Sequence, residues 1–372
     1  MQKICQYTKD HNNNFNALRL IAASAVLVSH SFTLTTGNPQ VEPFVRDVGL
    51  TLGTIAVHVF FVTSGFLVTG SLLSRRSVLD FCVARALRIY PALWLSQLVT
   101  VLVVGLWFTS LDSRTFFSEW HTWHSVLRNC VLLRGVDIEL PGAFQAVPFA
   151  AGGVNSALWT LPVELGMYIR LAIFWLVLAC IPKWGGRLFG AFIGLLAVVS
   201  VALAVAGIIA PLPHPLRISF GWVLTGMFFC GAALRLFQER VPMSHWLASI
   251  LGAVLLVSLV DREAFRITYL VVVPYLVIYA GLGLSVRGRR MVLRSDYSYG
   301  IYIYAYPIQQ GIAAILHGIT PVPMIALAYP LTLGCGAASW HLLEKRALKL
   351  KRSFGQLRLA RKSRGMSPLP EG

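Results

Sequence analysis

Charged side chains are scarce in this sequence. Asp, Glu, Lys and Arg make up only 13% of its 372 residues, whereas hydrophobic residues make up 56%. A soluble domain of this length needs far more polar surface, so this scarcity excludes a soluble globular enzyme. The mean hydropathy is +0.68, and apolar runs of about 20 residues recur, which is the length of a membrane-spanning helix. The sequence therefore predicts an all-α fold, a polytopic integral membrane helix bundle with the lipid bilayer as its solvent.

Cysteine and acidic residues are few as well. The six cysteines stand singly without a CxxC pair, which excludes a disulfide framework and a zinc pattern. His121 and His124 share a helix face in HTWH, but no third ligand presents itself, so we predict no metal site. The net charge is +17. Because no basic run is interleaved with aromatic residues on a soluble face, this charge does not indicate a nucleic-acid partner.

Ten candidate membrane spans follow from the apolar runs. They cover residues 15–35, 48–73, 92–111, 157–181, 188–210, 218–238, 246–260, 267–284, 298–317 and 322–343. We expect one membrane domain over residues 1–350, without a clear internal repeat, and a basic, disordered tail over 351–372. The stretch 75–91 is expected to lie at the membrane interface and to lead into the third span. The longest loop covers about 112–156, and a loop of that length is usually functional or disordered.

The basic residues set the orientation of the bundle. With a cytoplasmic N-terminus, the outer side holds only seven of the 32 Lys and Arg residues, namely Arg46, Arg114, Arg128, Arg134, Arg217, Arg262 and Arg266. Arg19 and Arg170 lie within spans, and all the others fall on the cytoplasmic side. An even number of spans then places both termini in the cytoplasm. We expect a multi-pass protein of the cell (inner) membrane, whose basic face is attracted to anionic lipid headgroups.

Two polar side chains stand on one face of the first span. Arg19 and His30 are eleven residues apart, which is three helical turns and roughly 16 Å along the axis. A charge inside hydrocarbon is costly, so this stripe suggests a cavity with the cation nearer the cytoplasm and the imidazole deeper. Imidazole suits general-base work near neutral pH. The alternative is an arginine that reaches the interface and a histidine that is hydrogen-bonded between helices.

Glu164 is the one acidic residue well inside a predicted span. Pro162 is expected to break the helix beside it, which is tolerated where backbone lines a cavity, and Tyr168 follows on the same face at i+4. We favour a functional role for this carboxylate. The alternative is a structural ion pair with Arg170, although those two residues do not share a helix face.

Two further groups lie at the expected inner end of the bundle. Arg85 and Arg88 occupy positions i and i+3, so their guanidinia form a fork for phosphate; the alternative is a simple topological signal. Ser64 lies in FFVTSGFL, where small residues permit close helix approach. It has no base beside it in the sequence, which favours packing or hydrogen bonding over a nucleophilic role. His58 in the same span is expected to hydrogen-bond between helices.

Two polar features mark the last two spans. Gln309 and Gln310 are adjacent within an otherwise apolar run, which favours a polar cavity over simple packing. Glu344 closes the last span, where it is as able to neutralise a nearby arginine as to touch a ligand.

Six motifs in order resemble a known family. They are Arg19 and His30 with ten residues between them, FFxxSGF from Phe60 to Phe66, the Arg85–Arg88 pair, LWTLPxE from Leu158 to Glu164, SYGIYIY from Ser298 to Tyr304, and Glu344 after the last span. The set is similar to the membrane-bound acyltransferase-3 family, which O-acetylates surface polysaccharides and other acceptors. The similarity runs over essentially the whole chain.

The resemblance implies a ten-helix core and a reaction across the bilayer. Acyl-CoA, most simply acetyl-CoA, is expected as a co-substrate on the cytoplasmic side, with no permanently bound cofactor, and a carbohydrate acceptor is met from the other side. Three positions depart from the family pattern: Ala305 where many members have histidine, His58 before the FF motif, and Arg346 where proline usually follows the last Glu-Lys. Ala305 leaves His30 as the single candidate base. Because an extra extracytoplasmic domain is lacking, the acyl group is transferred here or handed to a polysaccharide-assembly protein.

The residues receive expected roles on this basis. Arg85 and Arg88 hold the phosphates of CoA, Arg19 holds the donor further in, and His30 takes the proton of the attacking hydroxyl. Glu164 orients the imidazole or the sugar. Further substrate contacts are expected from Ser64 and from three aromatic side chains that form walls for a sugar, namely Trp159, Tyr299 and Tyr302.

Several alternatives stay open. An acyl intermediate on Ser64 or His30 is one, although we favour direct transfer. A secondary transporter or flippase, or a non-enzymatic partner in polysaccharide export, also fits buried Arg, His and Glu. Lipopolysaccharide O-antigen, exopolysaccharide, peptidoglycan and a signalling oligosaccharide all fit as acceptor.

Overall fold

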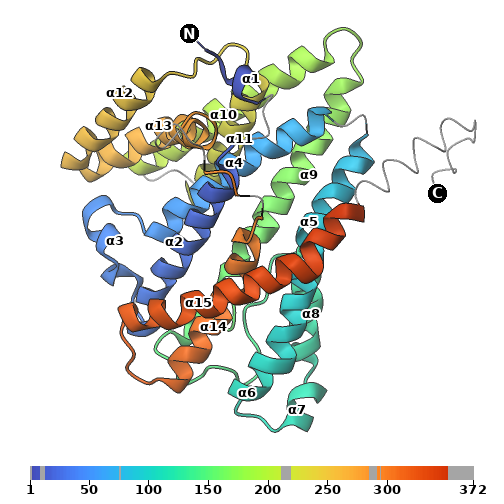
Figure 1. Cartoon of the computed structure of the whole chain (residues 1–372), viewed down its shortest axis with the longest axis vertical. Helices are drawn as coiled ribbons and strands as arrows, with labels where there is room; N and C mark the ends of the chain where they lie inside the picture. The colour runs from blue at the N-terminus through green and yellow to red at the C-terminus, as the bar shows by residue number, and fades with distance from the viewer. Residues whose placement is uncertain are drawn as a thin grey trace, which may run out of the picture.

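The computed structural model describes residues 2–8, 13–74, 77–210, 219–284, 291–293 and 295–350. Within these ranges the chain folds into helices and contains no β-strand (Figure 1). The tail 351–372 lies outside the described residues, as do several basic residues used for the orientation, namely Lys9, Arg75, Arg76, Arg217, Arg287, Arg289, Arg290 and Arg294.

Each of the ten predicted spans overlaps one helix. The helices are α2 (Phe15–Thr36), α4 (Leu52–Ser74), α5 (Val78–Val99), α9 (Thr160–Ala179), α10 (Gly185–Ile209), α11 (Ser219–Leu236), α12 (His245–Val257), α13 (Arg262–Leu282), α14 (Ser298–Ile315) and α15 (Pro321–Ser339). Seven helical segments of the described chain are long and apolar enough to cross a membrane. The chain is therefore an all-α, multi-pass membrane protein. Ten crossings stay a prediction, because the helices at 221–236 and 245–260 are shorter and α14 is not among the seven segments.

The third span differs from the prediction. The stretch expected at the interface is the first part of α5, which runs unbroken through Pro91 and continues by a π-helical turn, Thr100–Gly105, into α6 (Leu106–Phe108). This continuous segment of 31 residues is about 46 Å long, well beyond the ~30 Å hydrocarbon core. The Arg85–Arg88 pair therefore belongs to the helix that crosses the bundle and not to a separate surface helix.

The expected break at Pro162 is also not a break. A 3₁₀ turn, Ser156–Trp159, leads into α9, which begins at Thr160. Pro162 therefore sits in the first turn of the helix, where its missing N–H costs no helical hydrogen bond. The helix starts beside Glu164 instead of being interrupted there.

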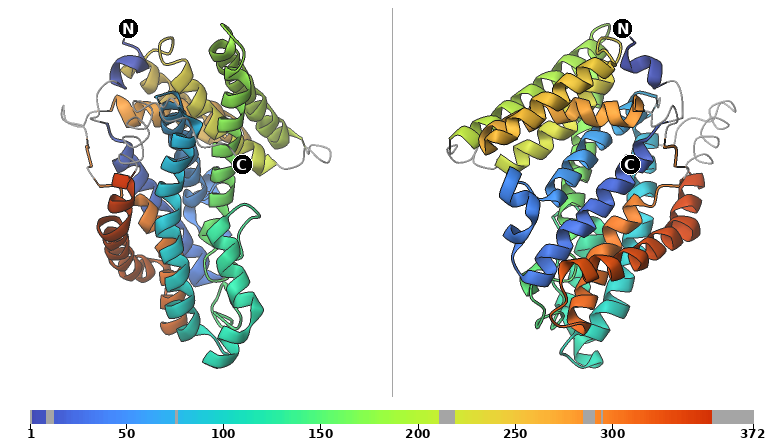
Figure 2. Two further views of the ribbon diagram at one scale, coloured as in Figure 1. Left: turned by 90° about the vertical axis from the view of Figure 1, so that its right-hand side faces the viewer. Right: turned by 60° about the vertical axis from the view of Figure 1, so that its left-hand side comes forward.

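The remaining helices are short. They are α1 (Ile4–Tyr7), α3 (Pro43–Val48), α7 (Ser113–Ser118) and α8 (Trp120–Val131), and the last two fold much of the long loop 112–156 into helix. Helices α2, α4 and α9 run side by side through the middle of the molecule, with α14 and α15 on one side, and α7 and α8 lie at the end opposite α12 (Figures 1 and 2). Helix α2 packs against both α4 and α14, so residues of α2 face the centre of the bundle.

Helices α4 and α11 approach each other most closely at Gly65. A Cβ atom on Gly65 would lie 1.9 Å from the carbonyl oxygen of Phe228 on α11, so only glycine allows this contact. Small residues permit such close backbone approach in membrane bundles. The contact fixes the position of α4 along α11 at Gly65, the residue that follows Ser64.

We predict that Gly65→Ala destabilises the folded bundle, because the added methyl group forces α4 and α11 apart. Overpacking of this kind costs about 1–3 kcal/mol. The midpoint of thermal unfolding of the detergent-solubilised protein is expected to fall. Gly252→Ala is the matched control, since no atom lies within 4 Å of a Cβ added there. An unchanged midpoint for Gly65→Ala would contradict the packing described for this contact.

Candidate active site

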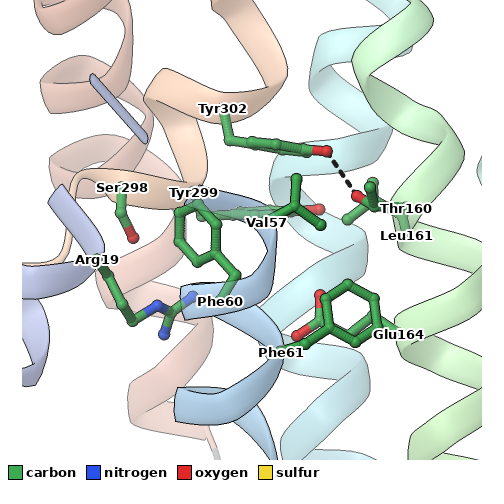
Figure 3. Close-up of a pocket in the computed structure, with 10 residues that line it drawn as sticks. All are labelled: Arg19, Val57, Phe60, Phe61, Thr160, Leu161, Glu164, Ser298, Tyr299 and Tyr302. Atoms are coloured by element: carbon green, nitrogen blue, oxygen red, sulfur yellow. Dashed lines mark hydrogen bonds between the residues drawn. The ribbon is translucent and has the colours of Figure 1, made fainter. Parts of the chain in front are cut away.

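The polar residues of α2, α4, α5, α9 and α14 meet at a cavity inside the bundle. The cavity has a volume of about 210 Å³, and its walls include Arg19, Ser64, Arg85, Arg88, Glu164 and Tyr168. A narrower cavity of about 30 Å³ adjoins it and shares Arg19, Glu164 and Tyr299. In the narrower cavity Arg19 and Glu164 stand on opposite sides, on α2 and α9 (Figure 3). Residues far apart in the sequence thus form one polar chamber.

Asp296, just before α14, ties two of the arginines together. Its carboxylate lies 3.2 Å from Arg19 Nη1 and also binds Arg88 Nη2, and it accepts a hydrogen bond from the hydroxyl of Ser298. Burial by itself raises the pKa of Asp296, but Arg19 and Arg88 outweigh it and hold the pKa at about 2. Asp296 was not recognised from the sequence, because it lies two residues before the predicted span 298–317 and outside the six motifs.

Arg88 is held on both sides. Besides Asp296 it donates to Glu344 Oε2 at 2.8 Å, and its guanidinium lies over the rings of Tyr299 and Trp340, 5.5 and 5.8 Å from their centroids. The expectation that Glu344 neutralises an arginine is confirmed. A phosphate at Arg88 would have to compete with two carboxylates, so Arg85 and Arg88 are not an equivalent pair.

Glu164 forms a carboxylate–hydroxyl cluster with two neighbours. Its Oε1 accepts hydrogen bonds from Ser64 Oγ, at 2.7 Å, and from the hydroxyl of Tyr168. The i+4 relation of Glu164 and Tyr168 is confirmed. The alternative ion pair is wrong, because Arg170 is exposed and donates to the carbonyl of Gly166. Ser64, which has no base near it in the sequence, thus has a carboxylate beside it that comes from 100 positions further along the chain.

His30 lies at a different level of the bundle. Its ring meets Tyr306 of α14 edge to face, with centroids 5.0 Å apart. It is not among the described residues that line either cavity. Neither described cavity therefore brings His30 together with Arg19, and the two residues are separated by roughly 16 Å along α2.

Of the three aromatic residues expected to form walls for a sugar, only two line a described cavity. Tyr299 and Tyr302 line the narrow cavity. Tyr302 donates to the carbonyl of Ala157 at 2.6 Å and is hydrogen-bonded to Thr160 Oγ1, which joins α14 to α9 beside this cavity (Figure 3). Trp159 is 37% exposed and is not a wall of either described cavity, contrary to expectation.

Three further histidines lie outside these cavities. His58 Nδ1 lies 3.0 Å from the hydroxyl of Tyr269, which confirms it as an interhelical hydrogen-bonding residue. His121 and His124 both face the carboxylate of Asp137, at 3.4 and 3.8 Å. Across the described residues no group of three His, Cys, Asp or Glu side chains is arranged to hold a metal ion.

Comparisons with known proteins fit this arrangement. A family model described as an acyltransferase domain, of the acyltransferase-3 type, matches residues 12–341. The chain is 32% identical to an O-acetyl transferase of Shigella phage Sf6, over 91% of this chain and 96% of that protein. It is 29% identical to nodulation protein 10 of Rhizobium leguminosarum bv. viciae, over 95% and 98% of the two chains.

A third relative and the solved structures complete the comparison. Acyltransferase MdmB of Streptomyces mycarofaciens is 28% identical over 45% of this chain and 40% of its own. No solved structure matches the chain significantly. Since the family model covers most of the sequence, this chain belongs to the membrane-bound acyltransferase-3 family and is an acyltransferase.

Proposed function

We propose that this enzyme transfers an acyl group, most simply acetyl, from acyl-CoA to a hydroxyl of a carbohydrate such as a cell-surface polysaccharide. The observation that carries the proposal is the buried chamber in which three arginines meet the Ser64–Glu164 pair. The name of the Shigella phage relative, an O-acetyl transferase, supports the acetyl group and the hydroxyl acceptor. Family membership favours this reading over the transporter and export-partner alternatives.

The donor enters at the end of the chamber that carries Arg85. In our proposal this end faces the cytoplasm, both termini lie on that side, and the protein resides in the inner membrane. Arg85 binds a phosphate of CoA, and Arg19 faces the pantetheine arm further in. That arm is about as long as four extended residues, ~14 Å, which is enough to carry the thioester toward the level of His30. We propose that the Tyr302–Thr160 contact opens to let it pass.

The acceptor enters from the opposite end, and His30 is the proposed general base. Its imidazole takes the proton of the acceptor hydroxyl while the oxygen attacks the thioester carbonyl carbon and the CoA thiolate leaves. Glu164 is too far along the bundle to orient the ring of His30. We propose instead that Glu164, together with Ser64, orients the donor.

The reaction itself is tested with labelled donor. Membranes that contain the protein are incubated with [¹⁴C]acetyl-CoA, and glycan is isolated and counted. We expect label in the glycan, and none with membranes that lack the protein. A protein that moves a glycan without modifying it would leave the glycan unlabelled.

We predict different outcomes for the two arginines of RALR. Arg85→Ala is expected to weaken CoA binding about 10- to 100-fold, which corresponds to the loss of one hydrogen bond to a charged group. Arg88→Ala unfolds or strongly destabilises the protein, because Asp296 and Glu344 are left buried without their partner, a loss of about 3–5 kcal/mol. Calorimetric titration with CoA and thermal unfolding separate the two. If both variants fold and weaken CoA binding equally, Arg85 and Arg88 both bind phosphate, as the sequence suggested, and the difference predicted here is wrong.

We predict that His30→Ala abolishes glycan acetylation while the protein still folds and binds CoA. Loss of a general base lowers the rate about 10²- to 10⁴-fold. His317→Ala is the control, since His317 is exposed in the turn after α14. Retention of acetylation by the His30 variant would remove this residue from the chemistry.

Direct transfer predicts no acyl group on Ser64. Protein incubated with [¹⁴C]acetyl-CoA without acceptor and then denatured should carry no label, and Ser64→Ala should lower transfer only about 10-fold by the loss of one hydrogen bond to Glu164. Ser96→Ala serves as control, because that buried hydroxyl bonds only the carbonyl of Leu93 in its own helix. Label on the peptide that contains Ser64 would establish an acyl-enzyme with Glu164 as its base.

A further inference from the structure

Buried polar atoms without partners gather around one end of α14. Among the described residues they include Asn155 Oδ1, Gln309 Oε1, Gln310 Oε1 and His30 Nδ1. The three amide side chains are 3%, 0% and 0% exposed. Buried polar groups in proteins almost always have a hydrogen-bond partner. This cluster, which lies at the opposite end of the bundle from the arginines, therefore calls for a partner that the protein does not itself supply.

The amide of Gln310 is fixed in one orientation. Its Nε2 donates to the carbonyl oxygens of Phe149 and Gly153, at 3.3 and 2.8 Å. Rotating the amide by half a turn would place Oε1 against two carbonyl oxygens, which cannot donate. The unpartnered atom is therefore the acceptor oxygen.

Asn155 is fixed for a related reason. Its Nδ2 donates to the carbonyl oxygen of Ile303 at 2.9 Å. That carbonyl has no helical partner, because the residue four positions on is Pro307, which lacks an N–H. The asparagine thus satisfies a carbonyl that the proline leaves open, and its own Oδ1 stays without a donor.

Gln309 repeats the pattern on the side of α14 that faces α2. Its Nε2 donates to the carbonyl oxygen of Leu27, at 2.9 Å, and contacts Ser31 Oγ. All three amides therefore use their donors on the protein and leave their acceptors unused. The adjacent glutamines that the sequence marked as polar cavity residues belong to this cluster.

Tyr306 and His30 stand in the middle of the cluster. Tyr306 lies on the same face of α14 as Ile303 and Gln310, one turn from each, and its ring meets His30. Its hydroxyl lies so close to Gly152 that a Cβ there would be 1.9 Å away. The loop that supplies Phe149, Gly152 and Asn155 therefore lies directly against the helix face beside His30.

The chemistry of the cluster selects its ligand. The three amide oxygens are fixed acceptors, and the Tyr306 hydroxyl beside them, which also has no partner, can accept or donate. The fixed acceptors are complementary to groups that donate hydrogen bonds, and they repel phosphates and carboxylates, which only accept. Carbohydrates present many hydroxyl donors. We propose that Asn155 and Gln310 form the acceptor subsite, where two sugar hydroxyls donate to the amide oxygens while a third reaches His30. This inference rests on the proposed function and names the side chains that recognise the acceptor.

The test compares the two substrates of the full-length enzyme. Unacetylated glycan, isolated from cells that lack the gene, is the acceptor probe, and [¹⁴C]acetyl-CoA is the donor. Asn155→Ala and Gln310→Ala are each expected to raise the KM for glycan at least tenfold and to leave the KM for acetyl-CoA within twofold.

Asn14→Ala is the matched control. That buried asparagine also donates to two backbone carbonyls, those of Ala280 and Leu284, but it lies at the other end of α2. It is expected to leave the KM for glycan unchanged. The Asn155 and Gln310 variants could show an unchanged KM for glycan and only a lower unfolding temperature. That result would mean that the cluster holds ordered water. Equal shifts of the KM for glycan and the KM for acetyl-CoA would mean that the two residues have a structural role. Either result overturns the subsite.

The outcome separates this inference from the proposed function. If the wild-type enzyme transfers no label from acetyl-CoA to glycan, the proposed reaction fails and the subsite fails with it. If the wild type transfers label and the variants match it, only the subsite is wrong.

Discussion

The bundle depends on the ion pairs that Asp296 and Glu344 make with Arg19 and Arg88. Such charges are costly to bury singly, and removing one partner leaves the other uncompensated in a low-dielectric interior. The pairs connect α2, α5, the residues just before α14 and the π-helical turn Trp340–Glu344 after α15, so four distant segments are tied at one level. The same contacts fix the two guanidinia in the wall of the chamber. Stability and the shape of the chamber therefore rest on one network.

A second constraint is the separation of polar groups into two levels. The arginines, Ser64 and Glu164 occupy one level, and His30 with the acceptor-rich amides occupies the other. Along α14, Tyr302, which is hydrogen-bonded to Thr160, lies between Tyr299 at the cavities and Tyr306 at the ring of His30. Under the proposed function, an anionic donor would bind at the arginines and a hydroxyl-rich acceptor at the amide oxygens.

Helical periodicity and composition predicted the helices well, because membrane spans are long apolar runs. They predicted less well where a helix begins. The interface helix before the third span is part of α5, since a proline inside a membrane helix does not end it. The polar residues of the chamber were recognisable as costly exceptions in apolar runs. Their partners were not, because contacts such as Ser64 with Glu164 join residues 100 positions apart, and no local spacing encodes them. His30 was placed on the correct helix face, but its distance from Arg19 was not weighed against the size of the cavity.

The proposed mechanism requires that the thioester passes the Tyr302–Thr160 contact and reacts at the level of His30. An experimental structure of the enzyme with a non-reactive acetyl-CoA analogue tests this requirement directly. We expect the phosphates at Arg85, the pantetheine arm along Arg19, and the acyl carbon beside His30, within reach of an attacking acceptor hydroxyl. An acyl group that ends beside Ser64 and Glu164, with the Tyr302–Thr160 contact still closed, would contradict it.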